Sequence, residues 1–134
     1  MSSRTTFLSK LIGLYLILIA LSMFTHKQAS VDTMTALVHN PPLLYVIGVI
    51  AVVAGLAMVL GHNVWSGGLF PLLVTLTGWL VLIKAMLLLF LPAEAVYGLL
   101  LAGTRFEQLF YLYSAVVLVL GICLAYGGFR AAEQ

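Results

Sequence analysis

Four long runs of apolar residues dominate the chain, and a shorter polar or mixed segment separates each run from the next. A helix needs about 20 apolar residues to cross the hydrocarbon core of a bilayer, at a rise of about 1.5 Å per residue. The runs meet this length and place spans at residues 6–25, 42–60, 69–91 and 106–127. The pattern therefore predicts an all-α polytopic membrane protein with four transmembrane helices.

The first run has an alternative interpretation as a secretory signal. A basic residue, Lys10, precedes the apolar stretch, and Ala20 and Ser22 near its end offer a weak cleavage site. We expect this segment to be retained as a transmembrane span.

The connections between spans are unequal, with one short turn at 61–68 (GHNVWSGG) and two long loops. In the first long loop, Ser30 or Asp32 is expected to cap a short helix that ends at the Asn-Pro-Pro sequence of residues 40–42. The apolar positions of that helix fall on one face at Val31, Met34, Leu37 and Val38. Such amphipathic segments favour a membrane surface, so we expect an interfacial helix here.

The second long loop contains the sequence AEAVYGLLLAG at 93–103, which is apolar enough to lie in the membrane interface. Thr104 and Glu107 then form a T-x-x-E sequence, the pattern of a capping box. We expect this box to begin the fourth span.

The two halves of the chain resemble each other at an offset of 65 to 66 residues, and the most specific matches are glycines. The aligned glycines are Gly13 with Gly78, Gly55 with Gly121 and Gly61 with Gly127, and Tyr45 aligns with Tyr111. The first and third spans point the same way, so the repeat would be parallel, about an axis along the membrane normal. We therefore expect one membrane domain, residues 1–134, in which repeat 6–61 and repeat 69–127 form a four-helix bundle of two similar hairpins.

Small residues recur at helical spacing on two faces of the second span. One face carries Gly48, Ala51 and Gly55, and a neighbouring face carries Ala54, Ala57 and Gly61. Small side chains let helix backbones approach closely in lipid. One face is therefore expected to pack inside the bundle, which leaves the other for a second copy or a partner.

Composition agrees with a membrane protein, because 63% of the residues are hydrophobic, 7% are charged, and the mean hydropathy is +1.19. Soluble domains carry about a quarter charged residues. The net charge of +2 is scattered along the chain, which argues against a nucleic-acid partner. The single cysteine, Cys123, excludes an intramolecular disulfide and a cysteine zinc site.

Lys84 lies inside the third span and is the strongest candidate for a functional residue. A charge in the hydrocarbon costs about 2.5–3.5 kcal/mol on insertion scales. Helical side chains lean toward the N-terminus, which for Lys84 is toward the membrane centre and makes snorkelling awkward. We therefore expect Lys84 to face the bundle beside Thr77 and to pair with Glu107, or with Asp32 as second choice. A structural pair and a transport or ligand site remain alternatives.

The short turn supplies three further candidates, His62, Asn63 and Trp65. Trp65 fits an anchor at the membrane interface, and the polar groups can cap the adjoining helix ends. A catalytic or proton-relay role for His62 is the alternative interpretation.

Nothing in the sequence favours an enzyme. It contains no arrangement of nucleophile, base and orienting group, no paired carboxylates and no glycine-rich phosphate loop. His26 and His39 share a loop with Asp32, but ordinary contact with water explains polar side chains in a loop better than a metal site does. We expect no cofactor and no metal.

The sequence HNVWSGG followed by TLTGWLVLIK, from His62 to Lys84, resembles a pattern found in small uncharacterised four-span bacterial membrane proteins. No known activity comes with this resemblance. It implies a bacterial cytoplasmic membrane and some importance for the residues of the pattern, which are His62, Asn63, Trp65, Gly78, Trp79 and Lys84.

Two function classes follow from these features. The first is a non-enzymatic structural or accessory component that self-associates or packs against a larger membrane complex. The second is a small oligomeric transporter or channel with an anion or proton site at Lys84 and Thr77. The scarcity of polar residues within the spans favours the accessory component.

The span count and the positive charges predict an orientation that labelling can test. Arg4, Lys10 and Arg130 share one side of the membrane, so we expect both termini and the short turn to be cytoplasmic. A membrane-impermeant thiol reagent added to intact cells should label Asp32→Cys and leave Asn63→Cys unlabelled. The reverse result would reject this orientation.

Overall fold

Four helices of the computed structural model are long and apolar enough to cross a membrane, so by length and composition the chain is a multi-pass membrane protein. The structure describes residues 2–103, 105–131 and 133, and this part of the chain contains helices and no strand. In chain order the helices are α1 (Ser3–Thr25), α2 (Lys27–Val38), α3 (Pro41–Gly61), α4 (Leu69–Phe90), α5 (Ala93–Val96), the π-helix η1 (Tyr97–Ala102) and α6 (Phe110–Arg130). The four spans are α1, α3, α4 and α6, close to their predicted ranges.

Local sequence explains where two of the spans begin. The hydroxyl of Ser2 accepts a hydrogen bond of 3.2 Å from the backbone N–H of Thr5 and caps α1. The side chain of Asn40 accepts one of 3.2 Å from the N–H of Leu43, with Pro41 following as the first residue of α3. The Asn-Pro-Pro sequence follows the end of α2, as predicted, and it also begins α3.

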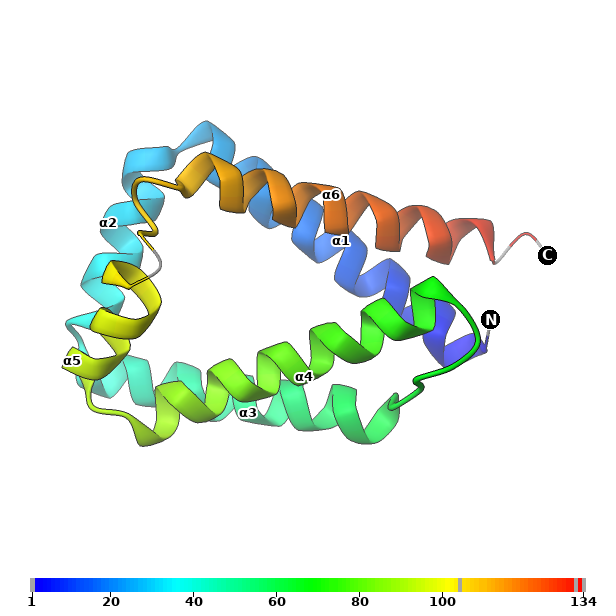
Figure 1. The fold of residues 1–134 in the computed structure, drawn as a ribbon, viewed down its shortest axis with the longest axis horizontal. Coiled ribbons are helices and arrows are strands. Elements are labelled where there is room, and N and C mark those ends of the chain that lie inside the picture. Colours follow the sequence, from blue (N-terminus) through cyan, green and yellow to red (C-terminus); the bar gives the residue numbers. More distant parts are fainter. Residues whose placement is uncertain (1, 104, 132, 134) are drawn as a thin grey trace.

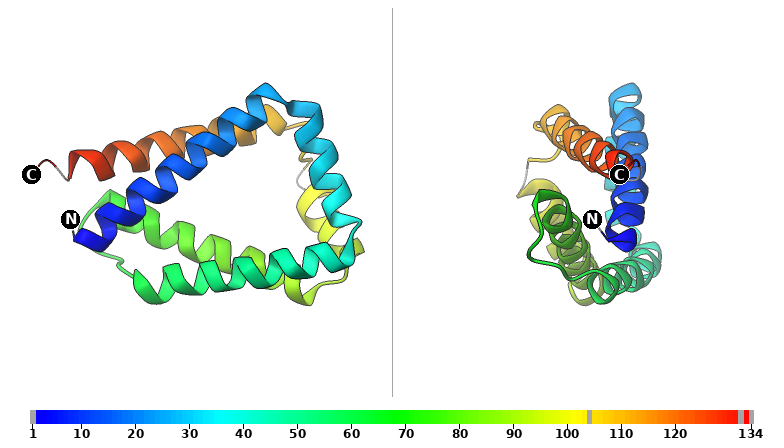
Figure 2. Two further views of the ribbon diagram at one scale, coloured as in Figure 1. Left: turned by 180° about the vertical axis from the view of Figure 1, so that it is seen from behind. Right: turned by 90° about the vertical axis from the view of Figure 1, so that its right-hand side faces the viewer.

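The four spans form two packed pairs, α1 with α6 and α3 with α4. Figure 1 shows the pairs converging at the end of the molecule that holds both termini and diverging toward the opposite end. The end-on view in Figure 2 places α1 beside α6 and α3 beside α4. The expected compact bundle of two hairpins is wrong in its pairing, because α1 packs against α6 and not against α3.

Glycines allow the backbones of each pair to meet. A Cβ added to Gly13 would lie 2.8 Å from the backbone oxygen of Gly121, and one on Gly121 would lie 2.9 Å from the backbone nitrogen of Ile17. In the other pair, a Cβ on Gly55 would lie 2.8 Å from the Cα of Leu82. No larger side chain fits at these positions without a shift of the backbone, so glycine sets the closeness of both pairs.

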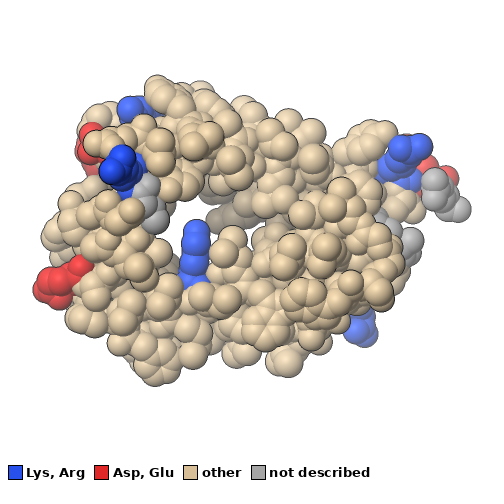
Figure 3. Space-filling model, viewed as in Figure 1, with Lys and Arg blue, Asp and Glu red and all other residues tan. Residues whose placement is uncertain are grey.

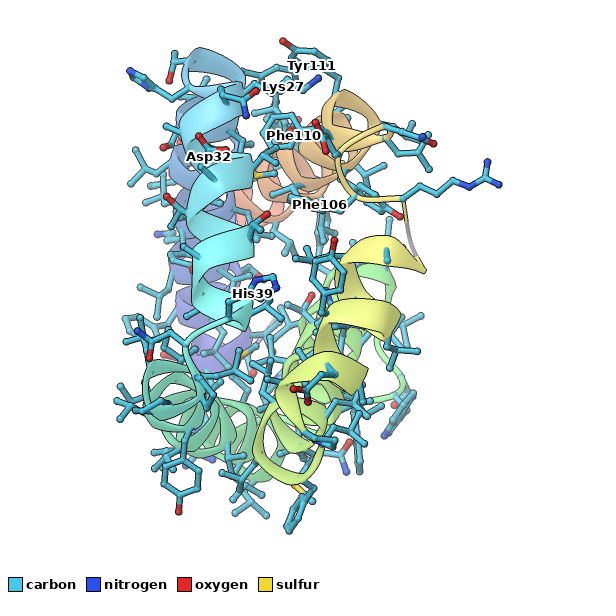
Figure 4. The ribbon with its side chains drawn as sticks, turned by 90° about the vertical axis from the view of Figure 1, so that its left-hand side faces the viewer. Lys27, Asp32, His39, Phe106, Phe110 and Tyr111 are labelled. Carbon is cyan, nitrogen blue, oxygen red and sulfur yellow. The ribbon has the colours of Figure 1, made fainter. Side chains whose placement is uncertain are left out.

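The two helix pairs lie furthest apart at the end of the molecule opposite the termini, here called the wide end. The helices of the two long loops bridge the pairs at this end. Figure 4 shows α2 beside α5 and η1, with Lys27 and Tyr111 together at one end of α2 and His39 at the other. The ammonium of Lys27 lies 5.1 Å from the ring centroid of Tyr111, and the rings of Phe106 and Phe110 meet edge to face at 5.7 Å. The contact of Lys27 with Tyr111 joins α2 to the start of α6.

Two expected caps in these loops are corrected. Helix α2 begins at Lys27, so Ser30 and Asp32 lie inside the helix, and the carboxylate of Asp32 instead accepts a hydrogen bond from the Gln28 side chain at 2.9 Å. Helix α6 begins at Phe110, without a side-chain cap, so Glu107 does not start it. Thr104, the other half of the expected capping box, lies outside the described residues.

The space between the pairs is partly open. Figure 3 shows a hollow between them. A cavity of about 370 Å³ lies between α1, α3 and α4, and apart from Tyr15, Met58 and Thr77 its walls are aliphatic. Nearer the termini, a second cavity is lined by Ala57 and Gly61 of α3 and by Ser3, Arg4 and Phe7 of α1, together with Leu8. Helices α1 and α3 therefore border a groove instead of packing.

The glycine contacts predict which substitutions destabilise the fold. Gly13→Ala and Gly121→Ala should each lower the free energy of unfolding by about 1–3 kcal/mol, because the added methyl group meets backbone atoms of the partner helix. Gly61→Ala is the control, since a Cβ there meets nothing within 4 Å. Thermal unfolding in detergent measures the three variants, and equal midpoints would contradict the role given to the two glycines.

Candidate functional site

The predicted histidine, His62, is buried where the short turn meets α1 and α4, with 4% of its surface exposed. Its Nε2 lies 3.3 Å from the backbone oxygen of Pro71 and its Nδ1 lies 3.5 Å from the hydroxyl of Thr5. A carbonyl oxygen only accepts, so Nε2 carries the hydrogen and Nδ1 receives the hydroxyl of Thr5. Both ring nitrogens are therefore used to join the turn to the two helices.

Thr75 fixes the turn to α4 more tightly. Its hydroxyl donates to the backbone oxygen of Val64 at 2.8 Å and accepts from the N–H of the same residue at 3.1 Å. The side chain of Thr75 is 1% exposed. One buried hydroxyl thus satisfies both backbone groups of a turn residue that has no helical partner.

Asn63 and Trp65 lie on the exposed side of the same turn. The Oδ1 atom of Asn63 accepts hydrogen bonds from the indole N–H of Trp65 at 2.7 Å and from that of Trp79 at 3.3 Å. Two tryptophans are thereby held together at the terminal end of the molecule. These side chains do not cap α4 as expected, because α4 begins at Leu69 and its N-cap residue, Gly68, makes no side-chain cap.

Sequence reasoning missed the polar face of α1 that meets this turn. Thr5 and Ser9 are one helical turn apart and are 2% and 0% exposed. The hydroxyl of Thr5 is 2.8 Å from that of Ser2, whereas the oxygen of Ser9 has no hydrogen-bond partner among the described residues. The signal available in the sequence was the spacing of Thr5, Ser9 and Gly13, which lie four residues apart on one face.

Lys84 lies on α4 in an exposed position, away from the short turn. It takes part in no hydrogen bond or ion pair with the described residues. Thr77, on the same helix, donates its hydroxyl to the backbone oxygen of Leu73 at 2.8 Å. Because the hydroxyl of Thr77 is bound within its own helix, the ammonium of Lys84 is left without a polar partner among the described residues.

The expected ion pair between Lys84 and Glu107 is not formed. Glu107 is exposed and lines a cavity of about 220 Å³ at the wide end of the molecule, with Thr35, Tyr97 and Arg105 among its neighbours. Asp32, the second choice, binds Gln28. The pairing was inferred from depth alone, and depth does not show that α4 and the segment before α6 diverge at this end.

The loop histidines do not form a site with each other. His26 precedes α2 and His39 follows it, so a helix of about 18 Å separates them. His26 contacts the hydroxyl of Thr25 at 2.9 Å, and a ring nitrogen of His39 contacts the backbone oxygen of Thr35 at 2.7 Å. No group of three metal-ligating side chains occurs among the residues that the structure describes.

The geometry thus provides two places with polar chemistry, the buried turn around His62 and the ammonium of Lys84. The first is occupied by intrachain hydrogen bonds, and the second is open. Comparison of the chain with protein-family models, with curated proteins and with solved structures found no match. The resemblance of the His62–Lys84 segment to small four-span bacterial proteins therefore stays a prediction.

The hydrogen bonds of Thr75 predict a stability difference between two threonines on one helix. Thr75→Val should lower the free energy of unfolding by about 1–2 kcal/mol, because both backbone groups of Val64 lose their partner. Thr77→Val should change it by less than about 0.5 kcal/mol, since that hydroxyl binds only a backbone oxygen of its own helix. Thermal unfolding in detergent compares the two, and an equal loss would contradict this assignment.

Proposed function

We propose that the protein is a non-enzymatic accessory component of a membrane, and that it works by packing against a second copy of itself or against a larger membrane complex. The observation that carries this proposal is the groove between α1 and α3. Ala57 and Gly61 line it, and a Cβ on Gly61 meets nothing within 4 Å. Small residues at helix surfaces are suited to close helix contacts in lipid, and here none of the described residues fills the position.

The use of the polar side chains supports the same proposal. The hydroxyls of Thr75, Thr77 and Ser114 bind backbone oxygens at 2.8 Å each, so they are engaged in holding the fold. His62 is engaged in the same way. An enzyme or a polar pathway would need such groups turned toward a substrate.

We further propose that the two halves are a parallel repeat. The register agrees with this, because Gly55 faces Leu82 in one pair and Gly121 faces Ile17 in the other, and these positions correspond at an offset of 65 to 66 residues. A twofold rotation along the membrane normal that exchanges the halves would also exchange the pair α1 and α6 with the pair α4 and α3. The superposition of the halves with Gly13 on Gly78 stays a prediction.

For location, we propose a bacterial cytoplasmic membrane with both termini and His62 on the cytoplasmic side. Membrane lipid surrounds the spans in this proposal, and α2, α5 and η1 lie at the opposite interface. The charges Lys10 and Arg130 at the terminal end agree with the positive-inside tendency.

A small transporter is the second candidate, and the open ammonium of Lys84 is what favours it. In that case the purified protein in vesicles would carry an anion or a proton, and Lys84→Met would abolish the flux. An accessory component would show no flux with either protein.

Cysteine crosslinking in membranes tests self-association through the groove. In a Cys123→Ala background, Ala57→Cys should form crosslinked dimers, because its side chain lies in the proposed contact. Val119→Cys is the control, since it is exposed on α6 and lies outside the groove. Equal yields at the two positions would indicate random collision and would reject self-association through this groove.

A further inference from the structure

Lys84 and the cavity between α1, α3 and α4 lie on the same side of α4. Thr77 and Val81 line the cavity. Successive residues of an α-helix are turned by about 100°, which places Lys84 about 20° from Thr77 and about 60° from Val81 around the helix axis. Figure 3 shows a basic side chain reaching into the hollow between the helix pairs. The ammonium therefore faces the gap and not the partner helix α3.

Lys84 is also at the depth of the cavity. The contacts of Gly55 with Leu82 and of Gly48 with Leu88 set the register of α3 against α4. This register puts Lys84 level with residues 52 and 53 of α3, inside the stretch Ile47–Met58 that lines the cavity. A lysine side chain leans toward the N-terminus of its helix, which brings the ammonium toward Val81.

The lining of the cavity indicates what can occupy it. Its volume is about 370 Å³, and most of its lining side chains are apolar. A flexible hydrocarbon chain suits such walls.

The charge of Lys84 calls for an anion, and the chain has none at that depth. Its acidic residues are Asp32, Glu94, Glu107 and Glu133, and all of them lie outside the four spans. A second copy could not supply an intramembrane carboxylate either. The anion therefore comes from another molecule, and a membrane lipid is the one that the apolar lining of the cavity suits.

We propose that this cavity binds an anionic acyl lipid, with its carboxylate or phosphate at Lys84 and its hydrocarbon chain along Ile12, Leu16 and Ala54. Lys84 is six residues, or about 9 Å, from the end of α4 at Phe90. The anion thus comes from the leaflet at the wide end, and its chain points toward the bilayer centre. This site is independent of the proposed accessory function and of the groove contact at Ala57.

Photolabelling with a fatty acid tests the site. The full-length protein is placed in phosphatidylcholine vesicles with a diazirine-bearing palmitate, irradiated, and mapped by mass spectrometry. Labels should appear in the peptides that contain residues 12–16 and 47–58. Unlabelled palmitate should compete and hexadecanol, with the same chain and no charge, should not. Competition by lysophosphatidate stronger than that by palmitate would assign a phosphate headgroup, and the reverse a carboxylate.

Variants distinguish the contribution of the Lys84 charge to lipid binding from that of the cavity. Lys84→Met should lower labelling about tenfold or more, because a charge-assisted hydrogen bond is lost, and Lys84→Arg should retain it. Lys10→Met is the matched control, since Lys10 lies over the ring of Phe129 at 4.8 Å, away from the cavity. Ala54→Phe should also abolish labelling by filling the cavity while Lys84 remains.

Several results would overturn the proposal. Equal labelling of the wild type and a folded Lys84→Met would show that the charge does not contribute to binding, and so would equal competition by hexadecanol. Undiminished labelling of Ala54→Phe would show that the lipid does not bind in the cavity, even if Lys84→Met failed to fold. Crosslinking at position 57 is measured separately, so a failure of self-association would be distinguished from a failure of lipid binding.

Discussion

Close contact between helix backbones is the constraint on which the structure depends. Lipid tails are as apolar as leucine side chains, so burial of apolar surface does not drive helices together within a bilayer. Packing contacts must do so, and they require the backbones to meet. Gly13 and Gly121 provide this between α1 and α6, and Gly55 provides it between α3 and α4. The rest of the architecture follows from these two close contacts, one within each helix pair.

Joining two tight pairs into one molecule requires different interactions, and these lie at the ends. At the terminal end, His62, Thr5 and Thr75 connect the short turn to α1 and α4 by buried hydrogen bonds. At the wide end, α2 and α5 with η1 bridge the pairs, and Lys27 packs on Tyr111. Between the two ends, the inner faces of α1 and α3 stay apart. Because α1 and α3 stay apart, a cavity remains open between them, and Lys84 has no partner among the described residues.

The sequence was sufficient for the elements and insufficient for their pairing. Apolar run length defined the four spans closely, and Asn40 with Pro41 marked the start of α3 because capping is local chemistry. Pairing depends on which face of each span meets another, and spans that are apolar on every side carry little information about this. The small-residue face with Gly48 and Gly55 was recognisable, but its partner was not. Lys84 stood out in the sequence as a charge within a span, whereas its expected bond to Glu107 was inferred from depth in the membrane, and depth does not show that α4 and the segment before α6 diverge at the wide end.

The convergence of the helix pairs gives the molecule an uneven outline across the membrane. Figure 1 shows that the frame is narrow where α1 and α4 begin and broad where α2 and α5 bridge it. In the proposed orientation, the protein therefore occupies more area in the outer leaflet than in the cytoplasmic one. Such a tapered inclusion fits best where the outer leaflet is stretched relative to the inner leaflet, so bilayer curvature itself would sort this protein among regions of a cell surface.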